Sequence, residues 1–271
     1  MDNNNFEFIR QFIKAETAIV LEPTKEYLVE CRLTPISKEL GFASLDELIH
    51  AFKRQPREEI KLKIIDAMTI NETLFFRDIH PFELLKTKIF PELKAKKSNK
   101  KVDIWCAAAS SGQEPYTIAM ILKELSSQFQ GWSINIIASD ISEKMLAKAK
   151  EGLYNQMEVN RGLPLTYLTQ FFEKKGPNWQ INKEIRDMVT FQKINLINPW
   201  AIPKMDLVFM RNVLIYFNID TKKEIVKRVE ATLNPEGYLF LGGAETTIWI
   251  NNQFVRVGID KFPCYQLKQN I

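Results

Sequence analysis

The chain has 271 residues, of which 45% are hydrophobic and 26% charged, a composition that is typical of globular proteins and excludes a disordered or fibrous chain. The two histidines, His50 and His80, exclude a zinc site built from several histidines and an HExxH motif, and a Ser–His–Asp triad would have to use one of them. Three scattered cysteines without a CxxC pair argue against a disulfide framework, and a net charge of +4 is too small by itself to indicate nucleic-acid binding.

The N-terminal segment has neither the basic stretch nor the apolar stretch of a signal peptide. No uninterrupted apolar run approaches the ~18 residues that a membrane span requires. The most apolar stretch, 205–217, is interrupted by Asp206, Arg211 and Asn212. We therefore expect a cytoplasmic protein without membrane insertion.

Residues 1–85 predict an N-terminal domain of four or five short helices and a linker. Apolar residues recur at helical spacing, for example over 8–13. Ser44 and Glu47 have the spacing of a capping box and predict a helix start, and Pro56 predicts another start by standing near a first helical position.

A lysine-rich stretch, 86–101, opens the second predicted domain, 86–271. Seven lysines are opposed there by Glu92 alone. The pattern favours a solvated helix end and loop in front of a new domain, and a docking patch for an acidic partner is the alternative.

From residue 102 onward, expected strands and helices alternate. The strands cover 102–107, 133–139, 205–210 and 237–242, and the helices cover 112–125, 142–150 and 221–233. This alternation predicts an α/β fold with a mostly parallel sheet that helices cover on both faces. Two late strands, 254–257 and 264–267, have no helix between them and predict one antiparallel strand.

Residues 153–195 interrupt the alternation. They contain two short apolar segments, 179–181 and 189–191, which we interpret as strands on either side of a turn. The stretch therefore predicts a small β-rich insertion.

Two features predict a binding site for a nucleoside-containing cofactor. Residues 107–115 follow the first strand and are mostly tiny, so a ligand could approach their backbone at a helix N-terminus, although a simple strand–helix turn would look similar. Asp140 ends the second strand, where an acid can accept hydrogen bonds from ribose hydroxyls. As an isolated residue, Asp140 could equally cap the helix that starts near Ser142.

Two further segments carry polar residues beside apolar ones. Arg211 and Asn212 follow the strand 205–210 and could lie in the cleft, or they could be a surface arginine and a capping asparagine. In residues 71–78, two aromatic residues stand between polar ones. The aromatics could join two subdomains, and Asn71, Thr73 and Arg77 could face the cleft.

Together, these pieces resemble the CheR-type chemotaxis receptor methyltransferases. The matching segments, in the order of that family, are NETLFFRD (71–78), WCAAASSGQEPYTIAM (105–120), ASDISEKMLAKAKEGLY (138–154), VNRGLP (159–164), INLINP (194–199), RNVLIYF (211–217) and LNPEGYLFLGGAE (233–245). They cover nearly the whole chain beyond residue 70. The resemblance implies a Rossmann-like methyltransferase sheet with a small β-subdomain, preceded by an all-helical domain.

The resemblance also implies an activity, a cofactor and a partner. Members of this family use S-adenosylmethionine to methylate glutamate side chains of chemoreceptors, so the expected partner is the cytoplasmic helical bundle of a chemoreceptor. We expect no nucleic-acid partner and a monomer. Two alternatives remain: a methyltransferase with another substrate, although the (N/D)PP(Y/F) signature of base-methylating enzymes is missing, and a cofactor-binding signalling module without turnover.

Site residues follow from the same resemblance, and no metal is among them. The implied cofactor-binding residues are Asn71, Thr73, Arg77, Glu114, Asp140, Asn195, Leu196, Arg211 and Asn212. Arg77 and Tyr216 match positions held close to the substrate carboxylate and are the expected catalytic residues. Ala107 and Ala109 stand where related enzymes often carry Gly or Ser, which puts a left-handed backbone position there in doubt. A glutamate with a pKa near 4.3 is ionised at pH 7, so the chemistry needs no strong base.

Overall fold

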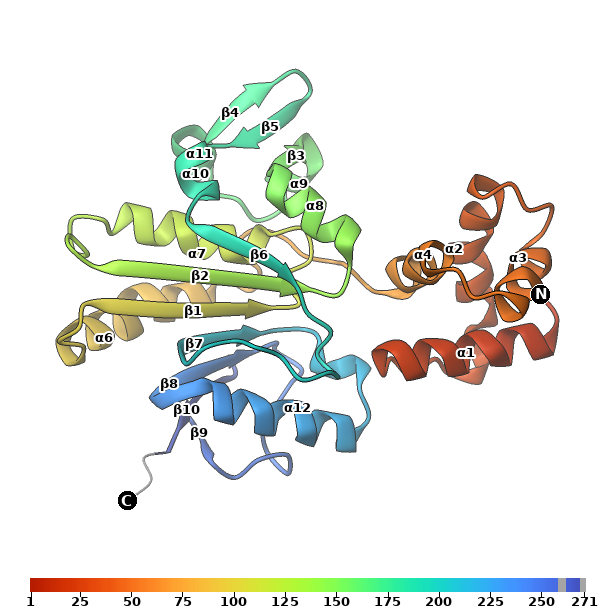
Figure 1. Cartoon of the computed structure of the whole chain (residues 1–271). Helices are drawn as coiled ribbons and strands as arrows, with labels where there is room; N and C mark the ends of the chain where they lie inside the picture. Colours follow the sequence, from red (N-terminus) through yellow and green to blue (C-terminus); the bar gives the residue numbers. More distant parts are fainter. Residues whose placement is uncertain (258–261, 269–271) are drawn as a thin grey trace.

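The computed structural model describes residues 1–257 and 262–268. It consists of a group of N-terminal helices and a larger α/β body. In Figure 1 these helices stand at one end of the body, on the side toward which the arrows of β1 (Lys101–Ala107) and β2 (Ser133–Asp140) point. No helix in the described part of the chain is long and apolar enough to cross a membrane.

The N-terminal helices are α1 (Asn3–Thr17), α2 (Glu26–Glu39), α3 (Leu45–Arg54) and α4 (Glu58–Met68). They share one hydrophobic cluster, to which Ile9, Leu33 and Ile64 contribute fully buried side chains. By contrast, Phe75 and Phe82 pack with the sheet. The helical region thus has a core of its own, separate from that of the sheet.

Two predicted helix starts can be compared with the structure. Ser44 caps α3 as predicted, by accepting a hydrogen bond from the Glu47 N–H. The Glu47 carboxylate accepts its own bond from Ala43, one residue before the cap. The second predicted start is confirmed, because α4 begins at Glu58 with two acidic residues in its first turn, although Pro56 stands one residue before the N-cap and not at the first helical position.

Over the described residues, the main sheet has seven strands in the order β6-β2-β1-β7-β8-β10-β9. The strands not yet introduced are β6 (Val189–Lys193), β7 (Met205–Met210), β8 (Leu233–Leu241), β9 (Phe254–Arg256) and β10 (Cys264–Leu267). β10 is the reversed strand, because it pairs antiparallel with both of its neighbours, β8 and β9. This confirms the predicted mostly parallel sheet with one antiparallel strand.

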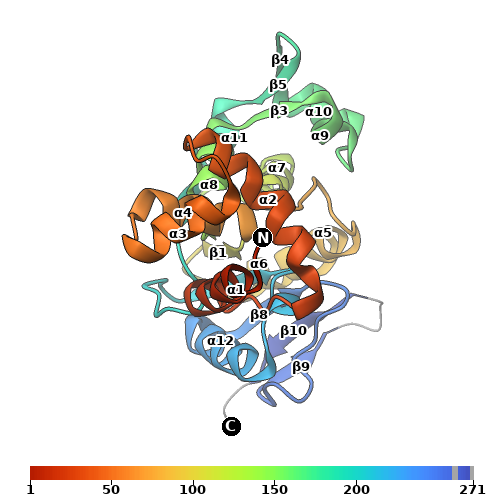
Figure 2. The same ribbon diagram turned by 90° about the vertical axis from the view of Figure 1, so that its right-hand side faces the viewer.

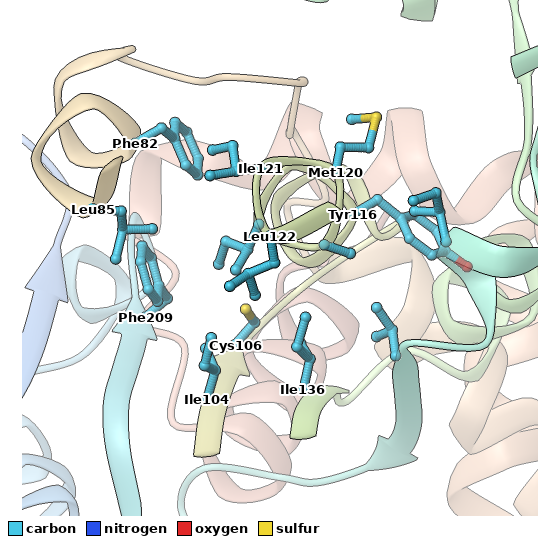
Figure 3. Packing of buried hydrophobic residues seen from close by; sticks show 14 of the residues in the cluster. Phe82, Leu85, Ile104, Cys106, Tyr116, Met120, Ile121, Leu122, Ile136 and Phe209 are labelled. Carbon is cyan, nitrogen blue, oxygen red and sulfur yellow. The ribbon is translucent and has the colours of Figure 1, made fainter. Parts of the chain in front are cut away.

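Helices cover the two faces of this sheet. Along β1, Ile104 and Cys106 point to one face, and Trp105 and Ala107 point to the other. Figure 3 shows Ile104, Cys106 and Ile136 beneath α7 (Gln113–Glu124). The opposite face is covered by α12 (Ile219–Thr232). Because both faces are covered, every residue of β7 is buried instead of every second one, and Asp206 is its single charged residue.

The structure corrects the predicted extent of the β-rich insertion. Its sheet consists of β3 (Leu153–Asn155), β4 (Phe172–Lys175) and β5 (Asn178–Ile181), and stands away from the main sheet in Figure 1. Residues 189–191 do not belong to it, because they lie in β6, which pairs in parallel with β2. A short apolar run shows that a strand forms but not which strand it pairs with.

The lysine-rich stretch forms short helical segments that lead into β1, among them α6 (Phe90–Lys96). Several of its lysines pair with the chain's own carboxylates: Lys86 with Glu124, Lys96 with Glu236, Lys97 with Asp206 and Lys101 with Asp103. This pattern agrees with a helix end in front of the sheet.

Candidate active site

A pocket lies at the carboxyl ends of β1, β2 and β7, between the sheet and the N-terminal helices. Figure 2 looks onto this end of the molecule, with α1–α4 in front of the strands. Including the part open to solvent, the pocket has a volume of about 910 Å³, a size within the usual range of cofactor sites. Its lining includes every predicted site residue: Asn71, Thr73, Arg77, Glu114, Asp140, Asn195, Leu196, Arg211, Asn212 and Tyr216. The individual roles of these residues stay predictions.

The loop after β1 approaches the pocket with its backbone. Left-handed φ angles occur at Ala108 (55°), Ser110 (49°) and Gly112 (90°), and therefore not at Ala107 or Ala109. An added Cβ at Gly112 would lie 2.9 Å from the Ala149 Cβ, so close packing as well as φ requires glycine there. The alanines that depart from the family pattern do not occupy the demanding backbone positions.

Asp140 is buried at the end of β2 and joins two loops. Its Oδ2 accepts a hydrogen bond from the Ser110 N–H at 2.8 Å, and its Oδ1 accepts one from the Ser142 N–H at 2.9 Å. Burial raises the pKa of this carboxyl, while the backbone N–H groups oppose that shift. The alternative that Asp140 caps the next helix was wrong, because Ser142 is the N-cap of α8 (Glu143–Glu151).

Arg211 is buried and connects three elements, so the alternative of a surface arginine was wrong. Its side chain is 2% exposed. Nη1 lies 2.7 Å from Glu114 Oε2, and Nη2 lies 2.7 Å from Asp78 Oδ2 and donates to the Arg77 carbonyl at 2.8 Å. Burial raises the pKa of Glu114, and the Arg211 guanidinium opposes that shift. Arg211 thereby ties residues 77–78 to the ends of β7 and α7.

Asn212 adopts a left-handed conformation, with a φ of 59°. It caps no helix, because the next turn (Leu214–Tyr216) has Val213 at its N-cap and α12 has Asn218. The alternative of a capping asparagine was therefore wrong. Its Oδ1 is buried and has no hydrogen-bond partner. An orphaned acceptor at a pocket wall is suited to a donor group of a ligand.

Both alternatives for residues 71–78 hold at once. Phe75 is fully buried and packs edgewise on Tyr154, which joins this segment to the core. The polar residues of the segment line the pocket. The Asn71 carbonyl accepts a hydrogen bond from Ser110 Oγ at 2.8 Å, and Arg77 Nη1 donates to the Glu72 carbonyl at 2.9 Å.

Tyr216 lies at the end of a short helical turn after β7. Burial raises the pKa of its hydroxyl, and the nearby Arg77 cation opposes the shift. The hydroxyl is therefore a neutral donor at physiological pH. The backbone carbonyl of Tyr216 accepts a hydrogen bond from the Val20 N–H at 3.4 Å, which joins this turn to the segment after α1.

The structure also brings in residues that sequence reasoning missed. Thr17 and Ile19, at and just after the end of α1, line the pocket, and the Glu16 carbonyl accepts a hydrogen bond from Asn195 Nδ2 at 2.7 Å. No local pattern signals that the end of α1 reaches the sheet. Glu245 is buried and accepts a hydrogen bond from the Asn212 N–H, and its position four residues after the end of β8, in an otherwise apolar segment, was a signal that could have been used.

Comparison with known proteins identifies the family. The family model described as "CheR methyltransferase, SAM binding domain" matches residues 71–262, and the one described as "CheR methyltransferase, all-alpha domain" matches residues 4–69. The chain belongs to the CheR methyltransferase family. Chemotaxis protein methyltransferase Cher2 of Pseudomonas putida is 40% identical over 98% of both chains. Chemotaxis protein methyltransferase 1 of Pseudomonas aeruginosa is 42% identical over 90% of both, and the enzyme of that name from Vibrio cholerae is 36% identical over 98% of both.

This CheR family member is thus an S-adenosylmethionine-dependent methyltransferase of chemotaxis. The residues at the pocket fit that cofactor. Tiny residues of the β1 loop line the pocket, a buried carboxylate stands at the end of β2, and Asn212 Oδ1 lacks a donor. These groups suit, in turn, close approach of a nucleoside, hydrogen bonds to ribose hydroxyls and an ammonium group.

Asp140→Asn is expected to raise the dissociation constant for S-adenosylmethionine about 10- to 100-fold, because hydrogen bonds to a charged group contribute ~1.5–3 kcal/mol. Titration calorimetry measures the change, and thermal unfolding checks that the fold is kept. Asp187→Asn is the matched control, since Asp187 is exposed and pairs with Lys183 on the surface. A dissociation constant within about twofold of wild type would contradict the ribose-binding role.

Proposed function

We propose that this CheR family member transfers methyl groups to glutamate side chains of chemoreceptors, acting in the cytoplasm as a monomer on the helical bundle of the receptor. One observation carries the proposal. A cation, Arg77, and a neutral hydroxyl, Tyr216, line the same pocket as the predicted cofactor residues. A cation and a hydrogen-bond donor together suit a carboxylate acceptor.

The reaction requires alignment more than proton transfer. S-adenosylmethionine, when bound, supplies a methyl group on a sulfonium centre. A glutamate is ionised at pH 7 and can attack without a base. This agrees with the pocket, whose described lining contains no histidine. Arg77 attracts the carboxylate and Tyr216 orients it, and such alignment can contribute ~7–11 kcal/mol in favourable cases.

Transfer of radiolabelled methyl groups to receptor cytoplasmic fragments tests the proposal. Methyl esters of glutamate release methanol in alkali, whereas N-methyl groups do not. We expect alkali-labile label that disappears when the accepting glutamates of the fragment are replaced by alanine. Alkali-stable label would support another methyl acceptor. Cofactor binding without transfer to any fragment would support a signalling module.

A further inference from the structure

Glu245 is a buried carboxylate next to the pocket, and it has neither a cofactor-binding nor a catalytic role among those described above. It is 6% exposed and follows β8 after a turn that starts at Gly242. Strands β7 and β8 pair in parallel, with Met210 opposite Leu241. Their carboxyl ends are therefore neighbours, and the residues after β8 lie beside the segment that carries Arg211, Asn212 and Tyr216.

The carboxylate accepts hydrogen bonds from three backbone N–H groups. Oε2 accepts from Gly242 at 2.6 Å and from Asn212 at 2.7 Å, and Oε1 accepts from Ile215 at 3.2 Å. Two of the three donors belong to the segment after β7. A carboxylate is a stronger acceptor than a neutral group, and both of its oxygens are used here.

The bonded segment has a backbone conformation that needs support. Asn212 has a φ of 59°, in the left-handed region that few residues other than glycine adopt and that asparagine enters more often than most. An added Cβ at Gly242 would lie 2.5 Å from Asn212 Nδ2 and 2.8 Å from Glu245 Oε2. Residue 242 must therefore be glycine for the two segments to approach so closely. Glu245 bonds Asn212 and Ile215 on either side of the turn that leads to Tyr216.

We propose that Glu245 is a positioning residue for methyl transfer. It holds residues 212–216 so that Asn212 presents its orphaned oxygen to the cofactor and Tyr216 presents its hydroxyl to the acceptor. The part that concerns the acceptor rests on the proposed function. The part that concerns the backbone of residues 212–216 does not depend on which acceptor is used.

Glu245→Gln tests the proposal with little change of volume. Glutamine keeps one acceptor oxygen, but its amide nitrogen cannot accept, so the backbone N–H on that side loses its acceptor, and the remaining bonds lose the negative charge. We expect kcat on receptor fragments to fall about 100-fold, as for other small displacements of aligned groups. The dissociation constant for S-adenosylmethionine should rise less than about tenfold, since Asp140 and the β1 loop are untouched. Glu224→Gln, at an exposed position on α12, is the matched control.

Two further measurements separate positioning from a general loss of structure. In a Tyr216→Phe background, adding Glu245→Gln should lower kcat by less than about threefold, because both substitutions impair the same function, the positioning of the acceptor by the Tyr216 hydroxyl. Amide hydrogen exchange should speed up in residues 212–215 while β1 and β7 stay protected. The exchange measurement needs no acceptor, so it gives an answer even if wild type fails to methylate receptor fragments.

Three results would each overturn the proposal. The first is a kcat within about twofold of wild type in Glu245→Gln. The second is unchanged exchange in residues 212–215. The third is a kcat loss that multiplies fully with that of Tyr216→Phe, because independent effects are additive in free energy.

Discussion

Arg77→Ala is expected to lower kcat for methyl transfer about 100-fold or more while raising the dissociation constant for S-adenosylmethionine less than about tenfold. Arg77 lines the pocket, and among the described residues its side chain has one hydrogen bond, from Nη1 to the Glu72 carbonyl. The other donors of the guanidinium can bind an acceptor carboxylate. Without them, the carboxylate loses both its attraction to the site and its alignment.

Steady-state kinetics on receptor fragments and titration calorimetry measure the two quantities for Arg77→Ala. Arg161→Ala is the matched control, because Arg161 pairs with the Glu72 carboxylate on the surface and does not line the pocket. Arg77→Lys should recover only part of the rate, since an ammonium cannot form the two parallel bonds of a guanidinium. Wild-type turnover in Arg77→Ala would show that the arginine does not handle the acceptor.

Arg211→Met is expected to lower the free energy of unfolding by about 3–5 kcal/mol, because it leaves a buried carboxylate without its partner. Glu114 provides most of the effect, since its side chain is 12% exposed. Asp78 is 42% exposed and contributes less, because water screens an exposed pair. Urea unfolding measures the loss, and Lys223→Met, at an exposed position on α12, is the control.

The free energy of unfolding that Arg211→Met loses relative to wild type should depend on pH. Burial raises the pKa of Glu114 in the folded protein, and the Arg211 cation, which opposes the shift, is absent from the variant. A carboxyl whose pKa is raised by folding destabilises the fold above its folded pKa and ceases to do so below its unfolded pKa. The difference from wild type should therefore shrink as the pH falls toward about 4.3.

The double variant Arg211→Met/Glu114→Gln separates the ion pair from its surroundings. Removing both charges takes away the unpaired buried carboxylate, so this variant should unfold at a higher urea concentration than Arg211→Met alone. If the two variants are equally unstable, then the loss comes from the packing of Arg211 between Phe82 and Phe262 and not from Glu114.

Sequence patterns predicted the elements of the sheet well, because these patterns are local. The apolar runs 102–107 and 205–210 correspond to β1 and β7. Asp140 is the last residue of β2, and a residue at the carboxyl end of a central parallel strand must lie at the binding edge. The same logic placed Arg211 at that edge, since β7 is also a central strand.

Sequence patterns did not predict strand pairings and contacts that depend on residues far apart in the chain. Residues 189–191 were predicted to be a strand of the insertion, but this strand belongs to the main sheet beside β2. The contact between Asn195 and Glu16 joins residues 179 positions apart. Left-handed angles at Ala108 and Ser110 occur in a loop that is hydrogen-bonded to Ser139, Asp140 and Asn71, residues that lie in other segments of the chain.

The sequence by itself determined the order of strands and helices, the small-residue loop and the polar residues that end the central strands. Periodicity and strand position encode these features, and both can be recognised within short segments. Only the tertiary structure decided that Arg211 joins Glu114 to Asp78, that the end of α1 lines the pocket and that Glu245 supports Asn212. Those contacts form between segments that the fold brings together, and no local pattern records which partner a buried charge will meet.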